Sequence, residues 1–410
     1  LVGSEMCIRD RFEQVRTEVE AELNAPLETV FRHFDEQPKA AASLAQVHRA
    51  TLLDGTPVIV KVQRPGIRDM VETDIDILYR RAKFLEAHWE RARIYGITDI
   101  VDEFAVTIRE ELDFTREARN TERLRKNLTE ARDILVPDVY WSLTTSRVLT
   151  LELLAGIKIT QLAEQPMEGV DPKKVANELA SAFLEQIFVD GFVHSDPHPG
   201  NLLVTAKGQI GLLDCGQVSR LDSASKNGAI RMLIAFEQQD ARRLADEIVY
   251  LSMSEFEVDM GRLSQDLSRV LRAFYDTPSR SVNLGALLVR VLNVAANHRI
   301  RLPVVFTVLG KVFTNIEGIC RQLNPDFNFT EVARNYALKA IRSELKSENT
   351  ITDLYQAISS LKNFLLALPE NLERLMRKAV EGNLRVEFKH QNLGPLAESF
   401  RTGANRVSIA

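Results

Sequence analysis

The sequence predicts an α+β fold in which a small, strand-bearing region precedes a larger helical one. A β-prone run surrounds Val47 and a second covers 57–63, and the Asp54-Gly55 pair between them is typical of a hairpin turn. Strand-like runs are concentrated before residue 155. After Asp214 the pattern is almost wholly that of amphipathic helices, up to about residue 385.

Helical periodicity accounts for most of the remaining segments. Residues 12–34 predict one helix, because Val15, Val19 and Leu23 recur four residues apart. The other predicted elements are helices over about 67–89, 98–128 and 172–189, and strands over 134–139 and 147–154.

Composition places the chain among ordinary globular proteins. Its 410 residues, 45% hydrophobic and 27% charged, can form two or three hydrophobic cores. The net charge of −5 provides no basic field for nucleic-acid binding. Three cysteines, Cys7, Cys215 and Cys320, are too few and too scattered for a disulfide framework, which favours a reducing compartment. No apolar run in the sequence approaches the ~18 residues that a membrane span requires.

A loop near the middle of the chain carries the residue types of a phosphoryl-transfer site. FVHSDPHPGNLLV, followed by GQIGLLDCG, contains Asp196, then Asn201 five residues later, then Asp214 thirteen further on. These are the groups and spacings that a protein-kinase catalytic site needs. We expect Asp196 to meet the hydroxyl that is phosphorylated, and Asn201 and Asp214 to bind magnesium ions. Together with the strand-then-helix pattern, they predict a bilobal protein-kinase-like fold with a small sheet-containing N-lobe and a larger helical C-lobe.

The loop around Asp196 has three competing interpretations. His194 would brace a catalytic loop that its two prolines stiffen. Alternatively, His194, Asp196 and His198 could form a metal cluster, but the prolines forbid the helix that would align the histidines. A plain surface loop would leave Asp214 and its spacing unexplained. Cys215, next to that acid, is expected to be a buried, inert thiol rather than a redox group.

A lysine and an alanine-rich turn belong to the predicted sheet. Lys61 lies in VIVKVQ on the second strand, where an ammonium among β-branched residues indicates a phosphate partner or an ion pair. The sequence ahead of it lacks a glycine-rich phosphate loop, and the corresponding turn is Ala40, Ala41, Ala42 and Ser43. Because alanines restrict positive φ, we expect a stiffer loop with altered nucleotide contacts.

Five segments, in order, carry a more specific resemblance. They are AAASLAQVHRA, VKVQRPG, EELDFTREARN, HSDPHPGN and LLDCG. Together they resemble the UbiB/AarF (ADCK-type) family of atypical kinases, from about residue 12 to the end of the chain. The resemblance implies a protein-kinase-like fold, ATP or ADP with Mg²⁺ as ligands, and support of ubiquinone or related prenylquinone biosynthesis at the cytoplasmic face of a membrane.

The same resemblance assigns acidic residues to the site. The family's acidic pair matches Glu111 and Asp113, and the REA segment supplies Glu117. On a continuous helix Glu111 and Glu117 would lie about 240° apart, so both could face Lys61 only if the helix broke. We expect Glu117 to pair with Lys61, and Glu111 and Asp113, the latter on the face of Glu117, to lie at the pocket mouth.

The adenine hinge is expected in LTLELLAG. Backbone groups of Glu152 and Leu154 would bind the base, with Leu151 as the gatekeeper. This assignment rests on position after a strand, because backbone recognition leaves little side-chain signature.

The resemblance also divides the chain. Residues 1–11 are expected to be a non-native leader, 12–154 an N-lobe with family-specific helices, 155–345 a helical C-lobe, and 346–410 a helical extension. The family's N-terminal K-x-G-Q motif, which would precede residue 12, is missing. The extension is expected to stop short of a membrane anchor.

Three functions fit these observations. The first is an ATP- and magnesium-dependent atypical kinase or ATPase whose substrate is a small molecule, lipid or protein, working with quinone-biosynthesis enzymes. The second is a low-turnover nucleotide-binding scaffold that organises membrane enzymes. The third is a small-molecule phosphotransferase of the aminoglycoside-kinase type, against which the AAAS turn and the EELD segment speak.

Overall fold

The computed structural model describes residues 12–336, except 42, 90–95, 129–132, 253–257 and 277–282. All of these described residues belong to the first of two units, Leu1–Ile341 and Arg342–Ala410, into which the chain divides. The predicted leader, the end of the C-lobe and the helical extension lie outside the described residues. The described part contains no helix that is both long and apolar enough to cross a membrane.

The chain begins with a helix that is shorter than predicted. Helix α1 (Phe12–Leu23) ends just before Asn24, whose φ of 51° leaves the helical region, and Pro26 disfavours helical geometry in the residue before it. Helix α2 (Leu27–Val30) and strand β1 (Phe31–Phe34) follow. The single helix predicted over 12–34 is therefore wrong in its second half.

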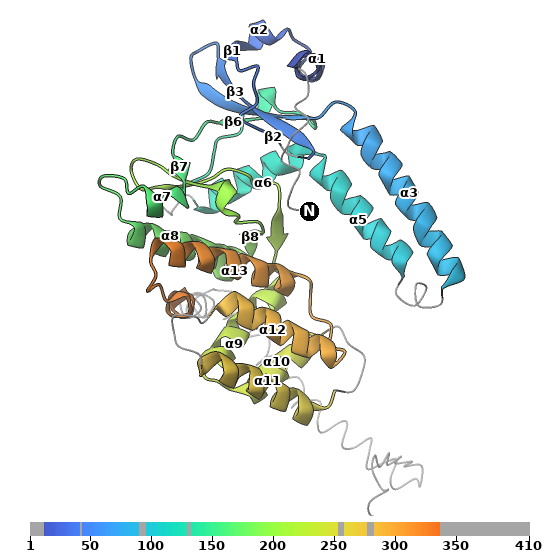
Figure 1. Cartoon of the computed structure of the whole chain (residues 1–410), viewed down its shortest axis with the longest axis vertical. Coiled ribbons are helices and arrows are strands. Elements are labelled where there is room, and N and C mark those ends of the chain that lie inside the picture. The colour runs from blue at the N-terminus through green and yellow to red at the C-terminus, as the bar shows by residue number, and fades with distance from the viewer. Residues whose placement is uncertain are drawn as a thin grey trace, which may run out of the picture. The chain divides into compact units, whose positions relative to one another are not determined.

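A five-stranded antiparallel sheet forms the N-terminal region (Figure 1). Its main strand order is β1-β3-β4-β6, and β2 pairs with β3. Valines on one face of β4 pack with α1 in a small core, whereas Lys61 lies on the other face, opposite Val47 and Leu149. The strands are β2 (Ala40–Ala41), β3 (Ala45–Leu52), β4 (Pro57–Gln63) and β6 (Val148–Glu152).

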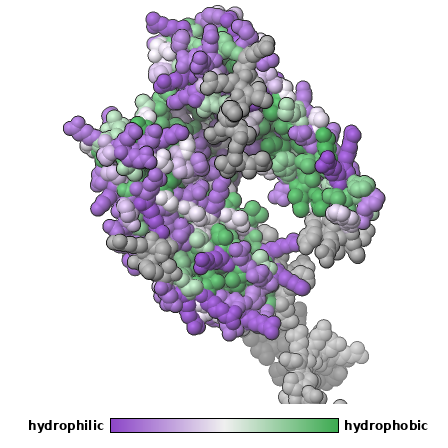
Figure 2. Space-filling model, viewed as in Figure 1, coloured by the Kyte–Doolittle hydropathy of each residue, from purple (hydrophilic) through white to green (hydrophobic). Residues whose placement is uncertain are grey.

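Two long helices that form a hairpin follow β4, namely α3 (Ile67–His88) and α5 (Ile97–Glu111) (Figure 1). Apolar side chains remain exposed along them, and green surface marks the hairpin in Figure 2. They include Phe84, Trp89 and Phe104.

The helix predicted over 98–128 is in fact two helices. It breaks after α5, and α6 (Phe114–Asn127) begins with Asp113 as its N-cap, whose carboxylate accepts from the Thr115 amide at 3.0 Å. At the break, the carbonyl of Leu112 accepts hydrogen bonds from Gln63 of β4 and, at 2.9 Å, from Arg68 of α3. Donors from other elements thus replace the lost helical hydrogen bonds.

Strands also occur after residue 155, contrary to the predicted concentration before it. Short strands form a four-stranded sheet of order β5-β10-β9-β7 and a two-stranded sheet of β8 and β11. The strand predicted over 134–139 is limited to β5. Two or three residues cannot show a period-two pattern, so periodicity does not reveal strands this short. The strands are β5 (Ile134–Leu135), β7 (Ile157–Lys158), β8 (Phe192–His194), β9 (Leu202–Val204), β10 (Ile210–Leu212) and β11 (Val218–Arg220).

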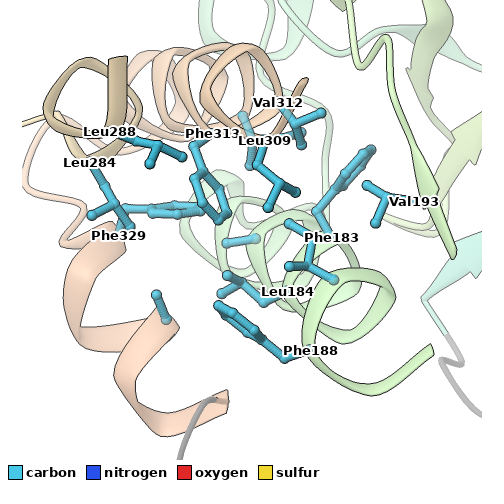
Figure 3. Packing of buried hydrophobic residues seen from close by; sticks show 14 of the residues in the cluster. Phe183, Leu184, Phe188, Val193, Leu284, Leu288, Leu309, Val312, Phe313 and Phe329 are labelled. Atoms are coloured by element: carbon cyan, nitrogen blue, oxygen red, sulfur yellow. The ribbon is translucent and has the colours of Figure 1, made fainter. Parts of the chain in front are cut away.

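Helices around one large hydrophobic core make up the rest. Figure 3 shows side chains of α8, α12 and α13 packed together, among them Phe183, Leu288 and Phe313. A π-helical turn, Gln186–Asp190, continues α8 and ends at Gly191, whose φ is 61°. The helices are α7 (Gln161–Glu164), α8 (Pro172–Glu185), α9 (Ser223–Glu237), α10 (Ala241–Tyr250), α11 (Met260–Tyr275), α12 (Leu284–Asn297) and α13 (Val305–Leu323).

Helices α12 and α13 approach each other at Gly285. A Cβ there would lie 2.3 Å from Thr314 Oγ1 and 2.4 Å from the Thr314 amide nitrogen. Beside this contact, the buried Glu317 carboxylate accepts from the Leu284 amide at 2.8 Å and pairs with Arg321 at 2.6 Å. The close approach of α12 and α13 therefore depends on glycine, which has no side chain, at position 285.

We expect Gly285→Ala to destabilise the fold by about 1–3 kcal/mol, because backbone atoms of α13 would have to move. Gly318→Ala is the matched control on α13, since a Cβ at Gly318 meets nothing within 4 Å. It should leave stability unchanged or raise it by about 0.5–1 kcal/mol. Urea denaturation of the two variants measures both effects, and equal stability would contradict the close packing.

Candidate functional site

Lys61 connects three elements that are distant in sequence. Its Nζ donates to Glu117 of α6, at 2.7 Å to Oε2 and 3.1 Å to Oε1. It also donates to Oδ2 of Asp214, which follows β10, at 3.3 Å. The ring of Phe114 lies 5.2 Å from the ammonium. The predicted Lys61–Glu117 ion pair is confirmed.

Burial and charge shift the pKa values in this cluster. Burial alone would lower the pKa of Lys61, but attraction to Glu117 and Asp214 outweighs it and places the pKa above its usual value. Burial raises the pKa of Glu117 to about 7, against the opposing pull of Lys61. Burial would also raise the pKa of Asp214, yet Lys61 and the Gly216 amide hold it below its usual value. Asp214 is thus kept ionised, as a cation ligand must be.

The catalytic loop begins where β8 ends. His194 is buried, and its Nδ1 accepts from the backbone amide of Asp196 at 3.1 Å. Its own amide donates to Gln186 Oε1 of the π-helical turn at 2.9 Å. Burial lowers the pKa of His194 below its usual value, so the ring is neutral. The histidine therefore braces the loop, as predicted.

Asn201 lies next to both acids. Its Nδ2 donates to the Asp196 carbonyl at 3.3 Å, which leaves the amide oxygen as the atom that could bind a cation. The backbone carbonyl of Asn201 accepts a hydrogen bond from the Leu213 amide at 2.9 Å, which connects the loop to the segment before Asp214. A carboxylate and an amide oxygen fit Mg²⁺, which takes its remaining oxygens from water and phosphate.

The histidines of the loop do not form the alternative metal cluster. His198 Nδ1 accepts from the Gly200 amide at 3.1 Å, and His194 Nδ1 accepts from the Asp196 amide. Across the described residues, no group of three or more His, Cys, Asp or Glu side chains is arranged to hold a metal ion.

One cavity of about 490 Å³ brings most of the predicted residues together. Its lining residues include Ser43, Lys61, Glu111, Asp113, Glu117, His194, Asp196, Asn201 and Asp214. The residues were predicted from separate motifs, and the fold brings them to one place.

The acidic pair, Glu111 and Asp113, lines the cavity. Glu111 ends α5 and its Oε1 accepts from Gln217 Nε2 at 2.9 Å. Asp113 is the N-cap of α6, the helix that carries Glu117, so the break places Glu111 and Glu117 on different helices.

The alanine turn is only partly a turn. Ala40 and Ala41 form β2, opposite Val47 and Gln46 of β3. Ser43 reaches the cavity. Ala42 lies outside the described residues, and a phosphate-binding role for this segment stays a prediction.

The predicted hinge lies on β6 and just beyond it. The Glu152 amide donates to the Asp138 carbonyl at 2.9 Å, and Glu152 Oε2 accepts from the Asp138 amide at 3.2 Å. Neither Glu152 nor Leu154 belongs to the described lining of the cavity, and neither does the gatekeeper Leu151. The adenine site stays a prediction.

Cys215 is buried beside Asp214, and burial raises the pKa of its thiol. An un-ionised, inaccessible thiol is inert. The interpretation of Cys215 as a packing residue is confirmed.

Sequence reasoning missed Lys311. This residue of α13 places its Nζ 2.7 Å from Asp196 Oδ1. No motif surrounds it, and only the packing of α13 brings it to the loop, so spacing along the chain carried no signal.

Family models match two parts of the chain. One described as the ABC1 atypical kinase-like domain matches residues 5–248, and one described as the UbiB helical domain matches residues 267–328. A solved structure, that of the Rv3197–erythromycin complex from Mycobacterium tuberculosis, superposes with a TM-score of 0.55 at 20% identity, over 78% of this chain and 84% of that one. This likeness shows the fold.

Curated relatives match most of the chain. It is 32% identical over 384 residues to uncharacterized protein sll1770 of Synechocystis sp., covering 92% of this chain and 65% of that protein. It is 28% identical over 387 residues to protein ACTIVITY OF BC1 COMPLEX KINASE 7, chloroplastic, of Arabidopsis thaliana, covering 92% and 55%. It is 31% identical over 391 residues to "Probable protein kinase UbiB" of Pseudomonas entomophila, covering 94% and 71%.

The chain therefore spans less than two thirds of the length of the first two of these relatives. The family is nevertheless shown by the model that matches residues 5–248 and by the Pseudomonas relative. The chain belongs to the ABC1/UbiB family of atypical kinase-like proteins and has the mixed α+β, kinase-like fold.

Proposed function

We propose that this protein binds ATP with Mg²⁺ and transfers the γ-phosphoryl group, as an atypical kinase or ATPase, in support of prenylquinone biosynthesis at the cytoplasmic face of a membrane. The observation that carries the catalytic part is the ion pair of Lys61 with Glu117, beside Asp214, in the cavity that also contains Asp196 and Asn201. The pathway and the membrane rest on family membership.

Each residue has a task in this proposal. Lys61, held by Glu117, positions phosphate oxygens of the nucleotide. Asp214 and Asn201 would hold Mg²⁺, which when bound neutralises charge on the triphosphate. Asp196 orients the attacking hydroxyl or water and takes up its proton. Because the transition state is loose, such positioning and charge neutralisation account for most of the catalysis.

The features around the cavity favour a small-molecule acceptor or water over a general protein substrate. Ala40 and Ala41 pair in a strand, where a glycine-rich loop would be free to wrap the phosphates. On the neighbouring side, Glu111 and Asp113 add negative charge to the cavity lining. Such a wall would repel acidic segments of a protein substrate.

We expect Asp214→Asn to abolish the magnesium-dependent part of the thermal shift that ATP produces, because it removes the charged metal ligand. Asp196→Asn is the matched isosteric control. It should keep the shift and lose phosphate release by about 10²–10⁴-fold, the usual range for a lost acid–base group. A full magnesium-dependent shift in Asp214→Asn would refute the metal assignment.

The wild-type protein could show a magnesium-dependent thermal shift with ATP but neither release phosphate nor phosphorylate an acceptor. This result would favour the nucleotide-binding scaffold. Phosphorylation of an aminoglycoside would favour the third function.

The Lys61–Glu117 pair should make nucleotide binding depend on pH. The raised pKa of Glu117, about 7, means that its carboxylate is present above pH 7 and is lost as the pH falls below it. Lys61 stays protonated throughout, because its pKa is raised. Lys61 then competes with Mg²⁺ for Asp214, so the ATP–magnesium shift should shrink between pH 8 and pH 6.

Glu117→Gln should give a small ATP–magnesium thermal shift, which varies less between pH 8 and pH 6 than the wild-type thermal shift does. Glu122→Gln, an exposed neighbour on α6 that accepts from Trp141, should keep the wild-type profile. Identical pH profiles for wild type and Glu117→Gln would exclude this role of Glu117.

The pathway is tested in cells. In a bacterium that lacks its own family member, the full-length gene should restore quinone levels measured by mass spectrometry, and its Asp214→Asn form should not. Unchanged quinone levels with the wild-type gene, expressed and folded, would count against the pathway.

A further inference from the structure

Helix α13 brings a cation to the catalytic loop. The ammonium of Lys311 lies 2.7 Å from Asp196 Oδ1, the carboxylate that meets the phosphoryl acceptor in the proposed function. Val308, one turn earlier on the same face of α13, lines the catalytic cavity. Two positions of one helix thus face the site, which makes α13 part of its wall.

The base of Lys311 is fixed by the core, while the rest of the side chain is half exposed. On either side of it, Leu309, Val312 and Phe313 are buried in the large core (Figure 3). The Lys311 side chain itself is 53% exposed. A long side chain on a fixed helix can exchange partners at small cost, as an ammonium that follows a reacting group must.

Other cations at the cavity are already engaged. Lys61 contacts both Glu117 and Asp214, and the guanidinium of Arg116 pairs with Glu110. These cations lie on the N-terminal side of the cavity, on β4 and α6.

The catalytic loop provides no cation of its own at this point. Between Asp196 and Asn201 the sequence is Pro-His-Pro-Gly, without lysine or arginine. The one basic side chain, that of His198, is turned toward the loop itself, where its Nδ1 accepts a hydrogen bond from the Gly200 amide at 3.1 Å. A positive charge beside Asp196 therefore has to come from elsewhere, and Lys311 provides it.

We propose that Lys311 is a catalytic residue, whose ammonium neutralises the charge of the phosphoryl group as it passes to the acceptor. The inference rests on the proposed function. In that step, an acceptor oxygen forms a bond to the γ-phosphorus, the bond to the β,γ-bridging oxygen breaks with its electron pair remaining on ADP, and Asp196 takes the acceptor's proton. Lys311 forms no covalent bond and keeps its protons.

Energetics favour this role over that of a permanent clamp on Asp196. The lysine side chain is 53% exposed and the aspartate side chain 31% exposed, and ion pairs that are open to solvent to this degree contribute little to stability. A phosphoryl group that carries more than one negative charge attracts the ammonium more strongly than one carboxylate does. The lysine can therefore leave Asp196 when nucleotide and acceptor are bound.

Three variants test the proposal: Lys311→Met, Lys311→Arg, and Lys207→Met as a control at an exposed turn lysine. Each is compared with wild type for the ATP–magnesium thermal shift and for kcat and KM of phosphate release. Lys311→Met should keep the shift and the KM for ATP within about twofold and lower kcat by about 10–100-fold, because a group that acts on developing charge affects kcat. Lys311→Arg should recover most of the activity, and Lys207→Met should equal wild type.

The outcomes separate this proposal from the function on which it rests. If wild type shows no magnesium-dependent shift with ATP, the proposed function fails and the role of Lys311 with it. If wild type shows the shift and turnover, but Lys311→Met turns over as fast as wild type, the role of Lys311 alone is refuted. Faster turnover in Lys311→Met would also refute it, since Lys311 would then restrain Asp196. Loss of the shift in Lys311→Met would mean that the lysine serves nucleotide binding, which contradicts a role confined to the chemical step.

Discussion

The ammonium of Lys61, placed between the carboxylates of Glu117 and Asp214, is the interaction on which the arrangement of the site depends. The lysine side chain is 18% exposed and that of Glu117 is 7% exposed, so neither charge can rely on water. Removing one partner of such a buried pair costs about 3–5 kcal/mol, because the other charge is left uncompensated. The sheet, α6 and the segment after β10 must therefore keep their relative positions for the charges to remain balanced.

The break between α5 and α6 makes this pairing possible. In a continuous helix, the axis of α5 would set the position of Glu117. Because the helix breaks, α6 has its own axis and packs next to the sheet. The Leu112 carbonyl at the break accepts from Gln63, which lies two residues beyond Lys61 on β4. Strand β4 therefore carries Lys61 and, through Gln63, also fixes the start of α6, the helix that carries Glu117. Both partners of the ion pair are thus positioned by the same strand.

Local patterns predicted the strand of Lys61, the helices after Asp214 and the residues of the catalytic loop. Lys61 and Glu117 could be paired from sequence because each belongs to a recognisable motif. The break at Leu112 could not be predicted, since its cause is the donors of Gln63 and Arg68, which are distant in sequence. Periodicity could not locate the short strands around the loop, because three residues show no period. Lys311 was missed because only the packing of α13 places it.

The large hydrophobic core described above runs through both segments that the family models treat as separate domains. Phe183 and Phe188 come from the first, Leu309 and Phe313 from the second, and all four belong to one buried cluster. Removing either segment would expose a large hydrophobic surface of the other to solvent. Recombination between related genes that joined a foreign second segment to this first one would therefore have to preserve the packing of this shared core. Evolution is expected to have passed the two segments on as a single heritable unit, and their sequences should change in concert.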